Sequence, residues 1–197
     1  PPPHPRKAAR PRTVSCPAIY SDYTSEQLIE MVEKKSPAFV KLRLKNNCRN
    51  TKNIGKVVQK IAKMTDNEYK IMKNDGDTID YRTFENLEQE AYILKLIIQH
   101  LMIKERIPVE DIAILAPVKY ENSVVSVVDE VKNYKIPFYT IQSFKGLEKS
   151  VIILTDIDNY QNDKLLYVGI SRAKDKLYVL ESINARQQRF QLFFGDV

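Results

Sequence analysis

Donor side chains gather just before a glycine in the second half of this 197-residue chain. Gly146 can bring bare backbone close to a ligand, and the apolar run at 151–154 predicts a buried strand that anchors the loop. Such a loop suits the binding of phosphate groups at the carboxyl edge of a parallel sheet. A simple turn is the alternative, because most Lys-Gly pairs are turns. The donors are Thr140, Gln142, Ser143 and Lys145.

Two arginines lie where a guanidinium could reach a ligand. Arg172 follows the apolar helical face of residues 165–170 and precedes a predicted strand at 176–180. Arg49 follows a predicted strand at 39–44, at the junction with the next helix. A guanidinium stays charged and forks onto phosphate oxygens, so both residues are candidates for binding phosphate. For Arg49, a solvated turn is the alternative.

Three segments resemble, in the same order, motifs IV, V and VI of superfamily 1 helicases of the UvrD/Rep type. Residues 44–51 (LKNNCRNT), followed by Ile54, are similar to motif IV, residues 145–148 (KGLE) to motif V, and residues 167–173 (YVGISRA) to motif VI. The match spans about residues 40–181 and covers only the second of that family's two RecA-like motor domains. Only about 90 residues separate the first two segments, so the resemblance is to a compact member without a large insertion there.

The resemblance implies a role for each matching residue. Arg172 would be the arginine finger and Arg49 a second contact to the γ-phosphate, which makes them the candidate catalytic residues. Glu148 would approach the ribose, beside Lys145 and Gly146 in the same nucleotide-binding loop. The candidate contacts to nucleic-acid strand phosphates are Thr140, Gln142 and Ser143.

Three positions depart from the family's pattern. Gln142 stands where a histidine is common, and Lys149 stands where an aromatic residue usually follows the glutamate. Cys48 replaces the usual aromatic residue before Arg49. The last change weakens the case for base stacking by this segment.

The chain contains no G-x-x-x-x-G-K-[ST] phosphate loop, and its five glycines are too scattered to supply one. In the family, this Walker A motif and Walker B belong to the first motor domain. The expected partners are therefore the first RecA-like domain of the same protein and single-stranded DNA or RNA, with no membrane. ATP with Mg²⁺ is the expected cofactor of the full-length protein, and the chain alone should neither bind it tightly nor hydrolyse it.

Two other classes of protein stay open. The first is a nucleic-acid or protein binding module that keeps the helicase fold without the motor activity. The second is an unrelated doubly wound enzyme or regulator whose motif matches are accidental. A deep, self-contained pocket distant from Arg49, Glu148 and Arg172 would favour the second class.

Composition and charge indicate a globular domain with an unusual start. The chain is 43% hydrophobic and 28% charged, and it has no apolar run long enough to cross a membrane. The first twenty residues hold four basic groups and no acid, so the formal charge of +6 falls to +2 for the rest. We predict a disordered or non-native arm over residues 1–20 and one RecA-like domain over 21–197.

Cysteine usage favours an intracellular, reducing compartment. Cys16 and Cys48 have no CxxC spacing, which argues against a zinc site, and no metal site is predicted. A disulfide between the two cysteines stays open. A turn at 74–77 and the acid pair Asp156 and Asp158 could mimic metal ligands, but a solvated turn and a loop that caps the next helix are the preferred interpretations.

Alternating strand and helix patterns predict an α/β fold with a doubly wound, mainly parallel sheet. Residues 69–72 and 78–81 are expected to form a hairpin around the turn, and the valine-rich residues 124–131 a helix. The aromatic end of the last helix, near residue 194, favours core closure or a partner interface over base stacking. Other strands are expected at 111–116 and 138–141, and other helices from residue 24, at 54–62, from 86 and at 184–194.

Overall fold

The structure is a computed structural model that describes residues 25–35 and 45–195. The chain divides into two units, Pro1–Leu44 and Lys45–Val197. The predictions of an arm over residues 1–20 and of a strand at 39–44 lie outside the described residues.

The described part of the first unit is a single helix, α1 (Ser25–Lys35). It confirms the helix predicted from residue 24. Glu30 and Lys34, four residues apart on one helical face, form an ion pair of 2.9 Å. Both side chains are exposed, so the pair adds only a few tenths of a kcal/mol to helix stability.

Five parallel strands form the sheet of the second unit, in the order β3-β7-β6-β4-β5. This arrangement confirms the predicted parallel α/β fold. The inner strands β4 and β6 contain nearly continuous apolar runs because helices cover both of their faces. The strands are β3 (Asp80–Phe84), β4 (Ile112–Ala116), β5 (Phe138–Thr140), β6 (Lys149–Ile157) and β7 (Ala173–Ser182).

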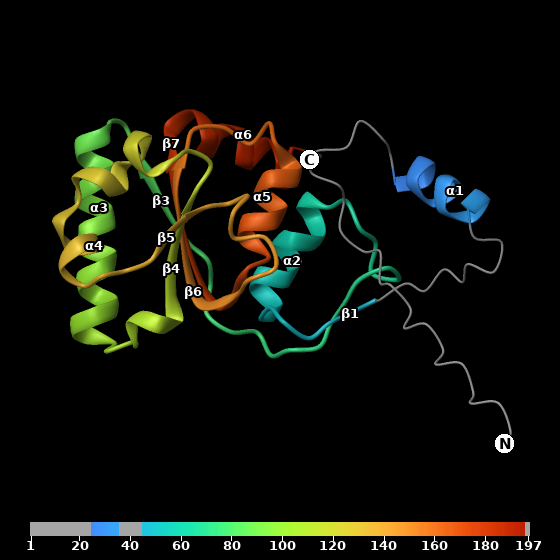
Figure 1. Ribbon diagram of the computed structural model, residues 1–197, viewed down its shortest axis with the longest axis horizontal. Coiled ribbons are helices and arrows are strands. Elements are labelled where there is room, and N and C mark those ends of the chain that lie inside the picture. The colour runs from blue at the N-terminus through green and yellow to red at the C-terminus, as the bar shows by residue number, and fades with distance from the viewer. Residues whose placement is uncertain (1–24, 36–44, 196–197) are drawn as a thin grey trace, which may run out of the picture. The chain divides into compact units, whose positions relative to one another are not determined.

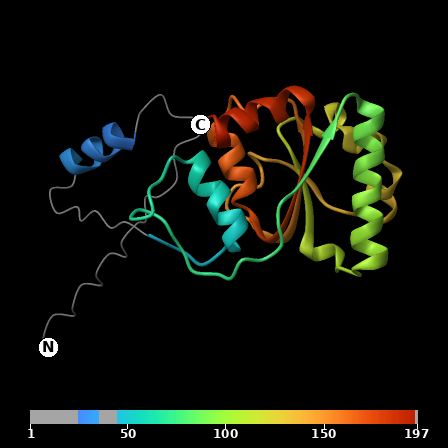
Figure 2. The ribbon, with the colours of Figure 1, turned by 180° about the vertical axis from the view of Figure 1, so that it is seen from behind.

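Helices cover the sheet in two layers, as Figures 1 and 2 show from opposite sides. One layer contains α3 (Leu87–Gln99), its π-helical continuation η1 (His100–Lys104) and α4 (Asp129–Asn133). The other contains α2 (Lys52–Ile61), α5 (Asp163–Ile170) and α6 (Ile183–Phe194). Three short 3₁₀ turns complete the connections: η2 (Val109–Asp111), η3 (Tyr120–Asn122) and η4 (Val124–Val127).

Helix α3 supplies much of the core on its side of the sheet. Its cap is Asn86, whose side chain accepts a hydrogen bond of 2.9 Å from the backbone N–H of Gln89, as the sequence predicts. Leu94, Ile98 and Leu101 are fully buried against the sheet. These residues form the packed face of α3 and of its continuation η1, which contains Leu101.

The expected hairpin at residues 69–81 is wrong. Two short strands, β1 (Asn46–Asn47) and β2 (Lys70–Ile71), pair in parallel with each other, while β3 pairs with β7. The turn between β2 and β3 caps α2 instead, because the carbonyls of Asn74 and Asp75 accept hydrogen bonds from the first N–H groups of that helix. Gly76 has a φ of +67°, and a side chain there would collide with Thr51.

The valine-rich segment also differs from the single helix that was expected. It forms η4, an extended residue at Val128 (φ −99°, ψ 105°) and then the short helix α4. The Ser123 side chain caps η4 by accepting a hydrogen bond from the N–H of Val125. Burial of Val124 and Val125 decides the conformation here, since valine has little helix preference of its own.

Candidate functional site

The candidate residues Arg49 and Glu148 lie together at the amino edge of the sheet. Their side chains form an ion pair, with 2.6 Å between Nε of Arg49 and Oε2 of Glu148. Glu148 directly precedes β6, and Arg49 lies just after β1. Each side chain remains 42% exposed, so a ligand can approach both charges.

Arg172 lies at the same edge, between α5 and β7, and is only 5% exposed. Its guanidinium donates hydrogen bonds to the carbonyl of Val168 (3.0 Å) and to Oγ of Ser171 (3.1 Å). A longer contact, of 3.5 Å, joins the guanidinium to the carbonyl of Leu147, the residue before Glu148. The three predicted residues therefore gather at one edge, with Arg172 more deeply placed than the other two.

Asn50 joins the segment of Arg49 to the segment of Arg172. Its side-chain amide donates hydrogen bonds to the carbonyls of Ser171 (3.2 Å) and Ala173 (2.5 Å), the two residues that flank Arg172. Asn50 is 2% exposed, and its partners are more than 120 residues away in the sequence. Asn50 lies directly before Thr51, the N-cap residue of α2, and no sequence pattern indicates these distant partners.

A second asparagine supports this junction. Asn47 donates a hydrogen bond to the Asn50 side chain (2.9 Å) and another to the hydroxyl of Tyr69. Its side-chain oxygen accepts from the backbone N–H groups of Arg49 (2.9 Å) and Asn50. Burial, with the nearby Tyr167, raises the pKa of Tyr69 to about 12, so this hydroxyl stays protonated at neutral pH. The Arg49 backbone is thus fixed while its side chain stays exposed.

The nucleotide-binding candidates before Glu148 are open to solvent. Lys145 and Gly146 are both exposed. Gly146 has a φ of +91°, and no heavy atom lies within 4 Å of where a β-carbon would stand. The left-handed backbone explains the glycine, and the empty space leaves room for a ligand.

The candidate contacts to nucleic-acid phosphates begin at the carboxyl edge of the sheet. Thr140 ends β5, and its Oγ1 bonds to Ser143 (3.0 Å) and accepts from the Ser143 N–H (3.2 Å), while Gln142 is exposed. Tyr139 and Leu154 pair with the same residue of β4, which places Tyr139, the residue before the end of β5, roughly 16 Å along the sheet from Lys149. The carboxyl edge predicted for the whole loop is therefore correct at Thr140 and wrong at residues 145–148, because the loop crosses to the amino edge before β6 begins.

The acid pair after the central strand has a structural role different from the one expected. Asp156 belongs to β6 and accepts hydrogen bonds from Oγ of Ser123 (2.6 Å) and the N–H of Val124 (2.9 Å), so it holds η4. The predicted capping of the next helix is wrong, because Asn162 caps α5. Within residues 25–35 and 45–195, no three histidine, cysteine, aspartate or glutamate side chains gather in a way that could hold a metal ion.

Glu90 is a buried acid that no sequence pattern indicated. It is 3% exposed, and its Oε1 accepts a hydrogen bond of 2.7 Å from the backbone N–H of Asp156. Burial, with repulsion from Asp156 and Asp158, raises the pKa of Glu90 to about 8 against the opposing effect of this hydrogen bond. The carboxyl edge of β6 therefore holds a carboxyl group that is largely protonated at neutral pH.

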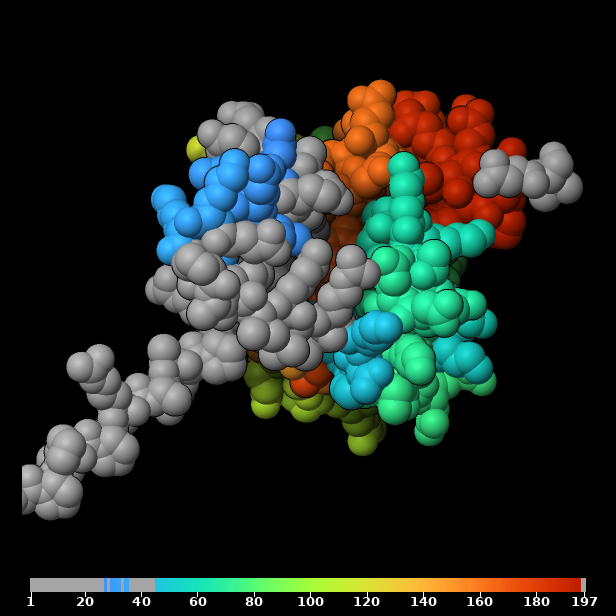
Figure 3. Space-filling model, turned by 90° about the vertical axis from the view of Figure 1, so that its right-hand side faces the viewer, coloured from blue at the N-terminus to red at the C-terminus, as the bar shows by residue number. Residues whose placement is uncertain are grey.

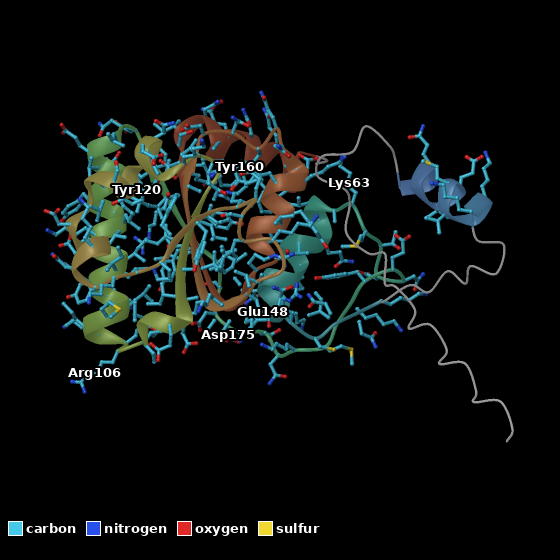
Figure 4. The ribbon with its side chains drawn as sticks, in the orientation of Figure 1. Lys63, Arg106, Tyr120, Glu148, Tyr160 and Asp175 are labelled. Atoms are coloured by element: carbon cyan, nitrogen blue, oxygen red, sulfur yellow. The ribbon has the colours of Figure 1, made fainter. Side chains whose placement is uncertain are left out.

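A second arginine–glutamate pair lies at the carboxyl edge. Glu181, near the end of β7, is fully buried and accepts hydrogen bonds of 2.7–3.0 Å from Arg189 of α6 and one of 2.9 Å from the Tyr160 hydroxyl. The Arg189 guanidinium also stacks on Tyr81, 3.8 Å from the ring centroid. Figure 4 shows Tyr160 at the opposite end of the strands from Glu148 and Asp175.

The amino-edge cluster presents groups whose chemistry suits a phosphorylated ligand. It offers an exposed guanidinium, a deeper guanidinium and a carboxylate that can accept hydrogen bonds from hydroxyl groups. Cys48, beside Arg49, is exposed, and the disulfide considered above involves Cys16, which lies outside the described residues. None of the described helices has the length and apolar character needed to cross a bilayer.

The fold and this edge define a doubly wound α/β domain that gathers two arginines and a glutamate from three distant segments. The model of the UvrD-like helicase C-terminal domain matches residues 42–154, more than half of the chain, and a second model of that description matches residues 136–180. The chain therefore belongs to the family of UvrD-like helicase C-terminal domains.

Solved helicase structures are similar to the chain at low sequence identity. The C-terminal domain of a possible DNA helicase from Lactobacillus plantarum WCFS1 is 18% identical, with a TM-score of 0.48 over 73% of this chain and 95% of that one. The PRRSV helicase is 19% identical, with a TM-score of 0.44 over 75% of this chain, which spans only 24% of that helicase's length. No curated protein compared with the chain matches it.

Proposed function

We propose that this domain is the second motor domain of an ATP-dependent superfamily 1 helicase that acts on DNA or RNA. A first RecA-like domain, outside this chain, would hold ATP and Mg²⁺ and complete the site. The observation that supports this function is the junction of Arg49, Glu148 and Arg172 at one edge, fixed by the buried side chain of Asn50. Segments that meet in this way can face one nucleotide.

Each residue at the amino edge has a role in this proposal. Arg172 is the arginine finger, which exchanges the long 3.5 Å contact to the Leu147 carbonyl for a phosphate oxygen. Arg49 is the second phosphate contact, and Glu148 accepts hydrogen bonds from the ribose hydroxyls, so binding replaces their ion pair. A guanidinium that neutralises charge on the transferring phosphoryl group contributes about 10³- to 10⁵-fold in rate.

The loop that crosses the sheet would link hydrolysis to movement along a strand. Thr140, Gln142 and Ser143 are the proposed contacts to strand phosphates, near one edge, and Lys145 and Gly146 the nucleotide contacts, near the other. Because Phe144 between them is fully buried, a shift at one end of the loop is transmitted through a packed side chain.

The test joins this chain to the first motor domain and replaces Arg172 with alanine. ATP turnover should fall by about 10³- to 10⁵-fold while nucleotide affinity stays nearly unchanged, and Arg172→Lys should not restore it, because an ammonium lacks the planar fork. The matched control is Arg186→Ala, an exposed arginine of α6. Unchanged turnover in Arg172→Ala would remove the residue from this role.

A binding module without motor activity is the second candidate. One observation favours it: Arg172 is 5% exposed and is held by neighbouring protein groups. On this alternative the isolated chain binds single-stranded nucleic acid with a clear salt dependence, and joining the first domain yields no ATP turnover. Turnover that depends on Arg172 would exclude it.

A further inference from the structure

A groove separates α2 from α6 on the helical layer that carries both. Its volume is about 640 Å³, within the range of ligand-binding pockets. Figure 3 shows the neighbouring surfaces of these helices, α2 in teal and α6 in red. Tyr81 of β3 contributes to the lining, so the groove lies at the β3 edge of the sheet, whereas Thr140 ends β5 at the opposite edge.

One wall of the groove is a row of lysines. Lys56 and Lys60 are four residues apart on α2, about 6 Å along the helix axis, and Lys63 follows just beyond the helix end. The Lys63 side chain is 75% exposed, and its ion pair with Asp163 is long, at 4.0 Å. Asp66 is the single acid among the lining residues. This wall therefore concentrates positive charge in a chain whose residues after position 20 carry only +2.

The other wall is aromatic. Phe193 and Phe194 end α6, and Phe194 is 59% exposed. The Lys60 ammonium lies 5.6 Å and 5.4 Å from their ring centroids and donates a hydrogen bond of 2.5 Å to the Phe193 carbonyl. Phe194 therefore does not close the core, whereas the partner interface that was also expected for this aromatic end stays a prediction, and the exposed ring can stack on a ligand.

We infer that this groove is a second binding site for single-stranded nucleic acid, with phosphates along the lysine row and bases stacked on the phenylalanines. Cations that follow a backbone beside aromatic faces are the combination that single-strand sites use. The choice of ligand class rests on the proposed function. The groove lies beside the outer strand β3, and Thr140 ends the other outer strand, β5. The site would therefore bind a part of the nucleic acid beyond the proposed loop contacts.

A peptide fits the groove less well. A peptide helix needs an apolar floor and apolar walls. Val57 and Met64 add apolar surface to the lining, but one wall is the lysine row, and the Arg189 guanidinium stacked on Tyr81 also lines the groove. These cations beside exposed aromatic rings favour a polyanion with flat aromatic groups.

The test measures binding of fluorescein-labelled 20-mers of oligothymidine and oligouridine to the 197-residue chain, by anisotropy between 20 and 200 mM NaCl. Lys56→Gln combined with Lys63→Gln should weaken binding and make the slope of log K against log salt shallower by about 1.4, since each single-strand phosphate contact contributes about 0.7. Phe194→Ala should weaken binding about tenfold through the loss of one stacked base.

Matched controls lie on the other helical layer. Lys104→Gln combined with Lys132→Gln makes the same change in charge at exposed positions of η1 and α4, and Tyr92→Ala removes an exposed ring from α3. Both should bind like the unchanged chain. Equal losses in the groove variants and these controls would overturn the inference, as would groove variants that keep full affinity.

Two further measurements locate the site and identify its ligand. Photocrosslinking with 5-iodouracil in the 20-mer should give an adduct in the peptide that contains Phe193 and Phe194. A 20-residue glutamate–phenylalanine peptide that binds more tightly than the oligonucleotides and loses affinity in the groove variants would assign the groove to an acidic protein partner, against the inference.

Failure of this site is distinguishable from failure of the proposed function. Thr140→Val removes a hydroxyl from the proposed strand contacts without touching the groove. Losses in Thr140→Val alone leave the proposed function standing and overturn the groove site. Losses in both sets, additive because the sites are well separated, are the expected result.

Discussion

Two arginine–glutamate pairs lie at opposite edges of the same sheet and differ chiefly in burial. Arg49 and Glu148 are each 42% exposed, whereas Glu181 is fully buried and Arg189 nearly so. An exposed pair is worth at most about 1 kcal/mol, so a ligand can replace either partner at little cost. A buried charge that loses its partner costs several kcal/mol. The amino edge is thus suited to exchange of partners, and the carboxyl edge to stability.

The largest expected effect comes from opening the buried pair. Arg189→Ala leaves the Glu181 carboxylate buried and without its cation, although the Tyr160 hydroxyl still donates to it, and should lower the free energy of unfolding by about 3–5 kcal/mol. Urea denaturation measures this loss. The control is Arg82→Ala, which opens an exposed pair with Asp80 and should cost less than about 1 kcal/mol. Equal losses would contradict the distinction by burial.

Glu90 makes the carboxyl edge sensitive to pH. Its pKa rises from an ordinary value of 4.5 to about 8 on folding, so between these values the folded state holds more protons and the free energy of unfolding falls as pH rises. The fall should be about 3 kcal/mol from pH 5 to pH 8. Glu90→Gln should flatten this dependence in denaturation curves, whereas Glu88→Gln, at an exposed position of the same helix, should leave it unchanged.

Asn50 connects the amino-edge segments and should have an intermediate effect. Asn50→Asp keeps the side-chain size but replaces the amide that donates to the Ser171 and Ala173 carbonyls, with an expected loss of about 1–3 kcal/mol in urea denaturation. Asn53→Asp is the matched control, since Asn53 donates to two carbonyls in an exposed setting. A silent Asn50→Asp variant would show that the junction does not need this amide.

The smallest effect is expected for the exposed pair. A double-mutant cycle with Arg49→Ala and Glu148→Ala should give a coupling free energy below about 1 kcal/mol, measured by urea denaturation. The same two substitutions, placed in the chain joined to its first motor domain, should each lower ATP turnover. A coupling above 2 kcal/mol would make the pair a structural element and contradict the proposed exchange with ligand.

Local patterns predicted most of the fold but not the pairing of every strand. The apolar run of β4 and the capping residue Asn86 identified their elements, because burial and capping act over a few residues. Turn-prone residues at 74–77 suggested a hairpin, yet nothing local says whether the flanking strands pair with each other. In the structure, contacts with α2 and β7 decide it.

The sequence predicted the charged residues of the candidate site but not the residues that hold them in place. The types and order of Arg49, Glu148 and Arg172 indicated a phosphate-binding edge. Asn50 gave no comparable signal, because an asparagine at the start of a helix suggests a cap. Its role depends on carbonyls more than 120 residues away, which only the tertiary fold brings within reach. The groove beside α6 depends in the same way on packing between distant helices.

The small sheet of β1 and β2 has a consequence for local stability. Two strands of two residues are marginal by themselves, so β1 and β2 rely on the hydrogen bonds from Asn50 and Thr51 to Ser171 and to the first residues of β7. The amide hydrogens of this small sheet should exchange with solvent sooner than those of the five-stranded sheet. On the proposed function, a nucleotide whose phosphate contacts both Arg49 and Arg172 would hold this small sheet in place and slow its amide exchange. Amide exchange would then report nucleotide binding.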